Sequence, residues 1–143
     1  MKKIKFTRKI PSGAIIFNDR SEVLLSQRVS KNSDWHGKWQ FPGGTIEFGE
    51  DPKDTAIRET MEEVGIKIKL LSQFPIVMNF KDDKRNEDFI CIAYPAKYLK
   101  GNINTRKDPA TSDAKWFKYE NINFKKCLPF TEEMINIAKK FIE

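Results

Sequence analysis

The feature that most constrains the fold of this chain is one short helix whose two ends are both marked in the sequence. Asp51 can accept a hydrogen bond as an N-cap residue, and Pro52 suits the first helical position because its missing N–H would be unpaired there anyway. Gly65 can adopt the left-handed conformation that ends a helix. The sequence therefore predicts a helix over about residues 52–64.

One face of this helix is predicted to be buried. Residues with apolar surface recur along it at helical spacing, and they are Ala56, Ile57, Thr60, Met61 and Val64. Thr60 fits such a face because its methyl group can pack on a sheet while its hydroxyl bonds the carbonyl one turn earlier. The helix is thus expected to cover one side of a sheet.

Three carboxylates crowd the end of the same helix. Glu59, Glu62 and Glu63 lie at positions i, i+3 and i+4, so they are neighbours on one face, and the last two lie where the helix dipole disfavours negative charge. A bound divalent cation would remove this cost, and hard ions such as Mg²⁺ or Mn²⁺ prefer oxygen ligands. The alternative is a solvated helix face on which Arg58 and Glu62 form an i, i+4 ion pair.

The loop before the helix favours a ligand site. The run Pro42-Gly43-Gly44 forms a tight turn that lets backbone approach a ligand closely, and Glu50 adds a fourth carboxylate. The whole stretch from Gly44 to Ile66 resembles the Nudix box, which is Gly, five residues, Glu, seven residues, Arg-Glu, an apolar residue, one residue, Glu-Glu, one residue, Gly and an apolar residue. All seven fixed letters are present, and only Thr60 departs, at an apolar position.

The resemblance implies a fold and an activity. The implied fold is the Nudix fold, an α/β architecture with a mixed β-sheet sandwiched between α-helices, here as a single domain over residues 1–143. Members of the family hydrolyse a nucleoside diphosphate linked to another group, with Mg²⁺, or alternatively Mn²⁺, as the cofactor. The catalytic residues that the resemblance implies are Arg58, Glu59 and Glu62. Metal binding would fall to Gly43 through its carbonyl and to Glu50, Glu59, Glu62 and Glu63.

Within this set, the resemblance assigns different roles. Glu59 would be either a metal ligand or the general base, and Arg58 would hold it in position through a charge-assisted hydrogen bond. Many relatives recruit one more acid from a loop beyond the box. Asp108 and Asp113 precede the Trp116 strand, and Asp113 is the favoured choice, with a surface turn residue as the alternative.

The substrate-binding residues are predicted from the run Lys38 to Glu50, which looks most like that of the MutT-type nucleoside triphosphate pyrophosphohydrolases. Arg28 falls where such enzymes often place a phosphate-binding arginine, although a surface arginine at a strand end is the alternative. The remaining candidates are Gly44 and the aromatic residues Trp39, Phe41 and Phe130, with Trp35 and Trp116 beside them. A core role is the alternative for any one of these aromatic residues.

Three functions follow from these features. The favoured one is hydrolysis of a nucleoside triphosphate, unmodified or modified, to the monophosphate and pyrophosphate. The second is hydrolysis of a nucleotide sugar, a dinucleoside polyphosphate or capped RNA by the same box. The third is a non-catalytic Nudix sensor that only binds a nucleotide, which loss of box carboxylates would favour. The box handles the diphosphate and leaves the rest of the ligand to other loops.

The remaining elements are predicted from hydrophobic patterning. Strands are expected at residues 14–17, 23–27, 89–94 and 115–119, with a β-rich region at 66–79 broken near Pro75 and a hairpin loop at 81–87. Trp39-Gln40-Phe41 leads into the Pro-Gly-Gly turn. Thr131 is expected to cap a last helix, whose apolar face contains Met134, Ala138, Phe141 and Ile142.

Composition limits the partners. The formal net charge is +6, but the lysines are scattered, so the charge suggests general attraction for polyanionic substrates and no specific nucleic acid is expected. Non-specific RNA binding and a solvated lysine surface without a partner are the alternatives. Cys91 and Cys127 are read as free thiols. The basic start of the chain is followed by no apolar run long enough for a signal peptide or a membrane span. A cytoplasmic enzyme without membrane partners, monomeric or homodimeric, is therefore expected.

Overall fold

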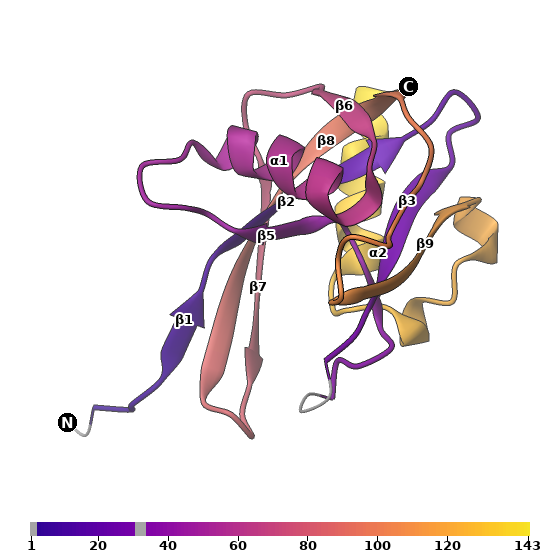
Figure 1. Ribbon diagram of the computed structural model, residues 1–143. Coiled ribbons are helices and arrows are strands. Elements are labelled where there is room, and N and C mark those ends of the chain that lie inside the picture. Colours follow the sequence, from indigo (N-terminus) through magenta and orange to yellow (C-terminus); the bar gives the residue numbers. More distant parts are fainter. Residues whose placement is uncertain (1–2, 31–33) are drawn as a thin grey trace.

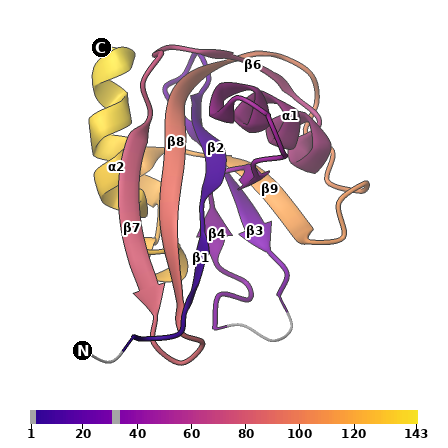
Figure 2. The ribbon, with the colours of Figure 1, turned by 90° about the vertical axis from the view of Figure 1, so that its left-hand side faces the viewer.

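A mixed β-sheet lies between two α-helices (Figures 1 and 2). The computed structural model describes residues 3–30 and 34–143. Its strands are β1 (Thr7–Lys9), β2 (Pro11–Phe17), β3 (Val23–Arg28), β4 (Trp39–Gln40), β5 (Gly43–Thr45), β6 (Lys67–Leu70), β7 (Ile76–Asp82), β8 (Glu87–Lys100) and β9 (Thr111–Phe117). The helices are α1 (Pro52–Val64) and α2 (Thr131–Ala138), with short 3-10 turns η1 (Tyr119–Asn121), η2 (Phe124–Lys126) and η3 (Lys139–Phe141). The predicted α/β sandwich is confirmed.

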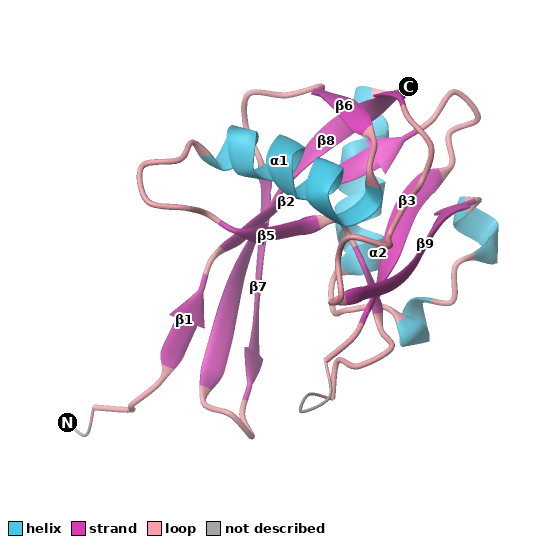
Figure 3. Ribbon diagram, in the orientation of Figure 1, coloured by secondary structure: helices cyan, strands magenta, loops and turns pink. Residues whose placement is uncertain are grey.

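The long strand β8 organises the sheet (Figure 3). It pairs in parallel with β1 and β2 along one edge and antiparallel with β6 and β7 along the other. The other edge of β2 pairs with β5, and Gly13 stands directly opposite Gly43. Strand β3 pairs with both β4 and β9. This topology places β5, which leads into the loop before α1, directly beside the central strand β2.

Strand β2 is buried on both faces because a helix covers each side of the sheet. Ala14 and Ile16 pack in a core with Ala56 of α1, whereas Ile15 and Phe17 pack on the other face with residues of α2. This division follows from the alternation of side chains along a strand. The two helices therefore stabilise the same strand from opposite sides.

Helix α1 begins and ends where the sequence predicts. The Asp51 side chain accepts a hydrogen bond from the backbone N–H of Lys53 at 2.8 Å, and Gly65 has φ 76°. The Thr60 hydroxyl donates to the Ala56 carbonyl at 2.7 Å, as expected. Local capping alone thus determines both boundaries of the helix that carries the carboxylates.

The buried face of α1 differs from the predicted one. Ala56, Thr60 and Val64 are fully buried, but Ile57 and Met61 are each 40% exposed. The prediction of one buried stripe was therefore wrong at these two positions. Helical periodicity alone makes neighbouring positions equally plausible members of the buried face. Contact with the sheet buries the row at i, i+4 and i+8, which is Ala56, Thr60 and Val64.

The last helix also begins differently from the prediction. Phe130, with φ 66°, precedes the first turn of α2 without a side-chain cap, and the Thr131 hydroxyl donates to the Leu128 carbonyl at 2.7 Å. Thr131 is therefore not the cap, because its hydroxyl is used by the preceding loop. The α-helix ends at Ala138, and Phe141 lies in a 3-10 turn with 45% of its surface exposed.

The strands are longer than predicted, and the hairpin loop is correspondingly shorter. Strand β8 extends well beyond residues 89–94, and β9 begins four residues before position 115. The break near Pro75 is present between β6 and β7. Both cysteines have free thiols, as predicted. Among the described residues there is no helix with the length and apolar character needed to cross a membrane.

Candidate active site

Arg58, in the middle of α1, gathers the carboxylates of the site around one guanidinium group. Its Nε and Nη2 atoms donate to the two oxygens of Glu50 at 2.8 and 2.9 Å. Its Nη1 atom donates to Glu59 at 3.0 Å and to Glu62 at 3.1 Å. One cation therefore joins the loop before α1 to the carboxylates of the helix, and the i, i+4 pair with Glu62 is present.

Glu50 is the anchor of this arrangement. The Thr55 hydroxyl donates to its Oε1 atom at 2.6 Å, so both carboxylate oxygens are engaged. The hydrogen bonds from Arg58 and then from Thr55 lower the pKa of Glu50 to about 2. Glu50 is therefore ionised at neutral pH and supports Arg58. Among the described residues, the Oε2 atom accepts only the bond from Arg58 Nε, so the direct metal binding that the sequence pattern suggested for Glu50 stays a prediction.

Glu63 is the buried member of the cluster, with only 6% of its surface exposed. The backbone N–H of Gly43 donates to its Oε1 atom at 3.3 Å, whereas its Oε2 atom has no hydrogen-bond partner within the described chain. Burial raises the pKa of Glu63 to about 9, and the neighbouring Glu59 carboxylate adds to the rise. A buried carboxylate with one unpaired oxygen is costly as an anion and fits a site that receives a cation.

Glu59 lies directly against the backbone of β5. A Cβ atom at Gly44 would stand 2.7 Å from both carboxylate oxygens of Glu59, so glycine is needed to leave room for that carboxylate. Burial raises the pKa of Glu59, and the positive charge of Arg58 opposes the rise. Glu59 is thus held between a cation and a glycine backbone at the point where β5 meets α1.

Two cavities flank this junction. The larger, of about 750 Å³, lies over the sheet and includes Gly43 and Gly44 in its wall. The smaller, of about 650 Å³, is lined by Glu59, Glu62 and Glu63 together with the loop that follows β8. The cavities adjoin, because the two glycines are in contact with Glu63 and Glu59. A ligand with one apolar part and one anionic part could lie across both.

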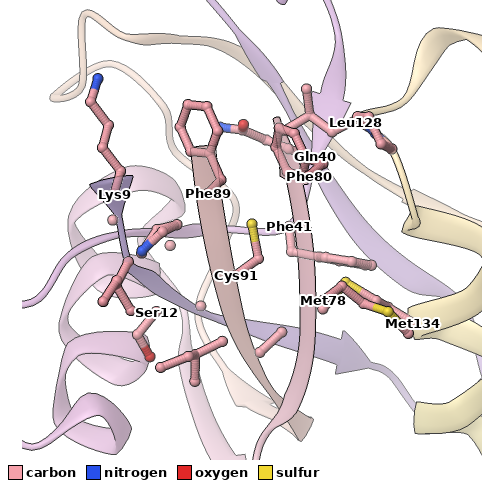
Figure 4. Close-up of a pocket in the computed structure, with 18 of the residues that line it drawn as sticks. Lys9, Ser12, Gln40, Phe41, Met78, Phe80, Phe89, Cys91, Leu128 and Met134 are labelled. Carbon is pink, nitrogen blue, oxygen red and sulfur yellow. The ribbon is translucent and has the colours of Figure 1, made fainter. Parts of the chain in front are cut away.

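The larger cavity is apolar over most of its wall (Figure 4). Phe80 of β7 and Phe89 of β8 stack with ring centroids 4.8 Å apart, and Trp35 meets Phe80 edge-on at 5.6 Å. Met78 and Met134 lie at the other end of the cavity, beside α2. Basic residues also belong to the wall, and they are Arg8, Lys9 and Arg28. Such a wall suits a flat aromatic group joined to an anion.

The carboxylate cluster fits a hard divalent cation. The side-chain ligands that it offers are carboxylate oxygens, which Mg²⁺ and Mn²⁺ prefer. In the described part of the chain no three such groups already converge on one point, because Arg58 draws Glu59 and Glu62 toward itself. The residues that could hold the ion are Glu59, Glu62 and Glu63, and Glu63 offers the unpartnered oxygen.

Of the two acids considered beyond the box, Asp108 is the one near the cluster. It lines the smaller cavity, and its charge contributes to the raised pKa of both Glu59 and Glu63. Asp113, which the sequence analysis favoured, lies on β9 and pairs with Lys115 at 3.5 Å. Asp108 is therefore the acid that the structure places beside the cluster, whereas a role for Asp113 in the site stays a prediction.

The predicted substrate-binding residues divide into two groups. Those that line the larger cavity are Arg28, Phe41 and Gly44, together with Trp35. The others lie elsewhere in the described structure: Trp39 packs edge-on against Phe117, Trp116 packs edge-on against Tyr98, and Phe130 precedes α2. For Trp39 and Trp116 the alternative core role therefore describes their packing better.

Several residues of the larger cavity were missed from the sequence. They are Gln40, Met78, Phe80 and Phe89. The alternation of side chains along β7 could have indicated Met78 and Phe80. Both are partly buried on one face of the strand, whereas Val77 is exposed on the other. The pattern shows which residues share a face but does not show that this face borders the site.

We predict that Gly44→Ala removes most of the activity, by at least roughly tenfold, while leaving the fold intact. The new Cβ would meet the end of a flexible side chain, so the Glu59 carboxylate would swing out of place at little cost to stability. Gly43→Ala is the comparison variant. Its Cβ would lie 2.7 Å from the Gly13 Cα atom, and this backbone clash should lower the thermal midpoint of unfolding. Turnover and thermal unfolding of both variants test this. Wild-type turnover in Gly44→Ala would contradict it.

The buried Glu63 predicts a pH dependence of stability in the metal-free protein. Its pKa rises from 4.5 to about 9 on folding, so the folded state holds the extra proton between these values and stability falls as pH increases through them. Glu63→Gln should flatten this fall and raise the thermal midpoint at pH 8. Thermal scans in chelator between pH 5 and 8 check it, and parallel curves for variant and wild type would count against a buried, protonated Glu63.

Comparison with known proteins agrees with this geometry. A family model described as the NUDIX domain matches residues 7–141. A protein named RNA pyrophosphohydrolase from Acinetobacter baylyi is 31% identical over 135 residues, covering 80% of this chain and 78% of that protein. Another of the same name, from Ruthia magnifica, is 30% identical over 146 residues, covering 86% of this chain and 76% of that protein.

Solved structures show the same fold. A NUDIX hydrolase from Nitrosomonas europaea superposes with a TM-score of 0.79 at 17% identity, covering 94% of this chain and 90% of that one. A MutT protein from Methanosarcina mazei gives 0.75 at 22% identity, covering 99% of both chains. Because the family model spans nearly all of the chain and the box carboxylates are in place, this protein belongs to the Nudix family and is a pyrophosphohydrolase that acts on nucleotide derivatives with a divalent cation.

Proposed function

We propose that this protein hydrolyses a nucleoside triphosphate, unmodified or modified, to the nucleoside monophosphate and pyrophosphate. The observation that carries the proposal is the junction at Gly43 and Gly44, where an apolar cavity with stacked aromatic rings adjoins a cavity of carboxylates. The base would lie in the first cavity and the phosphates beside the second. The likeness of the run from Lys38 to Glu50 to MutT-type enzymes supports the same class of substrate.

The base would rest against the aromatic pair of the sheet. Phe80 and Phe89 offer rings on adjacent strands, and stacking on such rings is worth about 1–3 kcal/mol per base and tolerates several bases. Arg28 lies in the wall of the same cavity, where its charge would attract the phosphate chain. The side chain of Gln40 would meet the edge of the base from β4.

The box residues would divide the chemistry. Glu62 and Glu63 would hold the ion, which we propose to be Mg²⁺, and when bound it offsets phosphate charge and polarises the anhydride. Glu59 would accept a proton from a water molecule as the water oxygen bonds to phosphorus. The bond to the bridging oxygen breaks in that step, and pyrophosphate leaves with the electron pair. Arg58, anchored by Glu50, would keep the Glu59 carboxylate aimed at the water.

A second candidate function comes from the sequence relatives. Two proteins of 30–31% identity are named RNA pyrophosphohydrolase, so the pyrophosphate linkage at an RNA end is the next substrate to consider. The apolar cavity would then receive the terminal base, and the rest of the chain would leave past the basic residues of its wall.

A panel of substrates incubated with Mg²⁺, with products separated by anion exchange, tests the proposal. We expect kcat/KM for at least one nucleoside triphosphate to exceed that for ADP-ribose, nucleotide sugars, dinucleoside polyphosphates and 5′-triphosphorylated RNA. Excess chelator should abolish turnover. A preference for RNA would establish the second candidate, and a preference for ADP-ribose or a nucleotide sugar would overturn both.

The cavity itself is tested by a matched pair of variants on β7. Phe80→Ala should raise KM for the preferred nucleotide roughly tenfold, because a stacking surface is lost. Val77→Ala is the control, since its side chain is 52% exposed on the opposite face of the same strand and should leave KM unchanged. Equal KM values for the two variants would place the base elsewhere.

A further inference from the structure

The smaller cavity contains a single cationic side chain among the described residues of its wall. Lys107, on the loop between β8 and β9, faces the same space as Glu59, Glu62 and Glu63. The other charged residue of this loop in the wall is Asp108. A cavity that is otherwise acidic thus has one lysine on the side opposite the helix.

The loop holds this lysine in a fixed place. On one side of Lys107, the backbone N–H of Asn104 donates to the Val64 carbonyl at 2.9 Å and so ties the loop to the end of α1. On the other side, the Asp108 carboxylate accepts a hydrogen bond from the backbone N–H of Ala110 at 2.9 Å. Lys107 therefore lies in a turn that is tied to the end of α1 on one side and is closed by the Asp108 hydrogen bond on the other.

The charge of Lys107 is not used by the protein itself. It forms no ion pair with any residue in the described ranges 3–30 and 34–143. The other cation of the site, Arg58, is already saturated by Glu50, Glu59 and Glu62. Within residues 3–30 and 34–143, Lys107 is thus the cation in the wall of the smaller cavity that remains available to a bound anion.

The ligand of the site adds negative charge where the protein already has a surplus. Glu59, Glu62, Glu63 and Asp108 surround the place where the phosphates would lie, and a metal ion offsets only part of the combined charge. The larger cavity, which would hold the base, lies on the other side of Gly43 and Gly44 from these carboxylates. The phosphates most distant from the base therefore come to the side of the loop.

We propose that Lys107 binds the terminal phosphates of the substrate, which leave as pyrophosphate. This inference rests on the proposed function and deepens it. The ammonium group would also stabilise the charge that develops on the leaving oxygen.

Titration of inorganic pyrophosphate into the full chain loaded with Mg²⁺ tests this without a nucleoside. Lys107→Met should weaken pyrophosphate binding roughly tenfold, because a charged hydrogen bond is lost. Lys107→Arg should retain most of the affinity. Arg106→Met is the control, since the neighbouring residue lies outside the wall of the cavity and should bind as the wild type does.

A separate measurement excludes an indirect effect through the metal. Mn²⁺ affinity should not fall in Lys107→Met, because the variant removes a positive charge from an acidic cavity. Any of three results would overturn the inference. Lys107→Met could bind pyrophosphate as tightly as the wild type, the wild type could fail to bind pyrophosphate, or Lys107→Met could lose Mn²⁺ affinity together with pyrophosphate affinity. Preference for a substrate other than a triphosphate would overturn the proposed function, yet weakened pyrophosphate binding in Lys107→Met would still support the phosphate site.

Discussion

The two hydrogen bonds between Arg58 and Glu50 are the interaction on which the rest of the site depends. They attach the loop that follows β5 to the exposed side of α1, and they leave one guanidinium nitrogen free to reach Glu59 and Glu62. A bidentate pair fixes orientation as well as distance, which a lysine at the same position would not do. Arg58 thereby places carboxylates from the helix at the mouth of the cavity, although like charges would otherwise separate them.

The site is built at some expense of stability. Glu63 is buried at the end of a helix whose dipole disfavours negative charge, and its Oε2 atom has no hydrogen-bond partner among the described residues. Burial, together with the neighbouring Glu59 carboxylate, raises the pKa of Glu63. A side chain at Gly43 would clash with the Gly13 backbone, and one at Gly44 would clash with the Glu59 carboxylate, so the junction between sheet and helix accepts only glycine at both positions. Burial of the Glu63 carboxylate therefore lowers the stability of the metal-free protein as pH rises above 4.5 and prepares a place for a cation, as expected where function and stability conflict.

The sequence was informative where the determining interactions are local. Both ends of α1 could be predicted because Asp51 and Gly65 act within a single turn. The buried face could not be located fully, since periodicity gives spacing whereas the sheet decides that Ile57 remains exposed. Phe80 was missed because its partner ring comes from another strand. Asp108 was not preferred because its place in the cavity wall depends on how a loop distant in sequence packs against the end of α1.

We propose that the carboxylates of α1 form the binding site for the divalent cation, with the buried Glu63 as a principal ligand. Titration with Mn²⁺, followed by electron paramagnetic resonance of the free ion, measures this most directly. We predict that Glu63→Gln weakens Mn²⁺ binding by roughly tenfold or more, while Glu133→Gln, an exposed acid on α2, binds as the wild type does. Equal Mn²⁺ affinity in Glu63→Gln and the wild type would contradict the account.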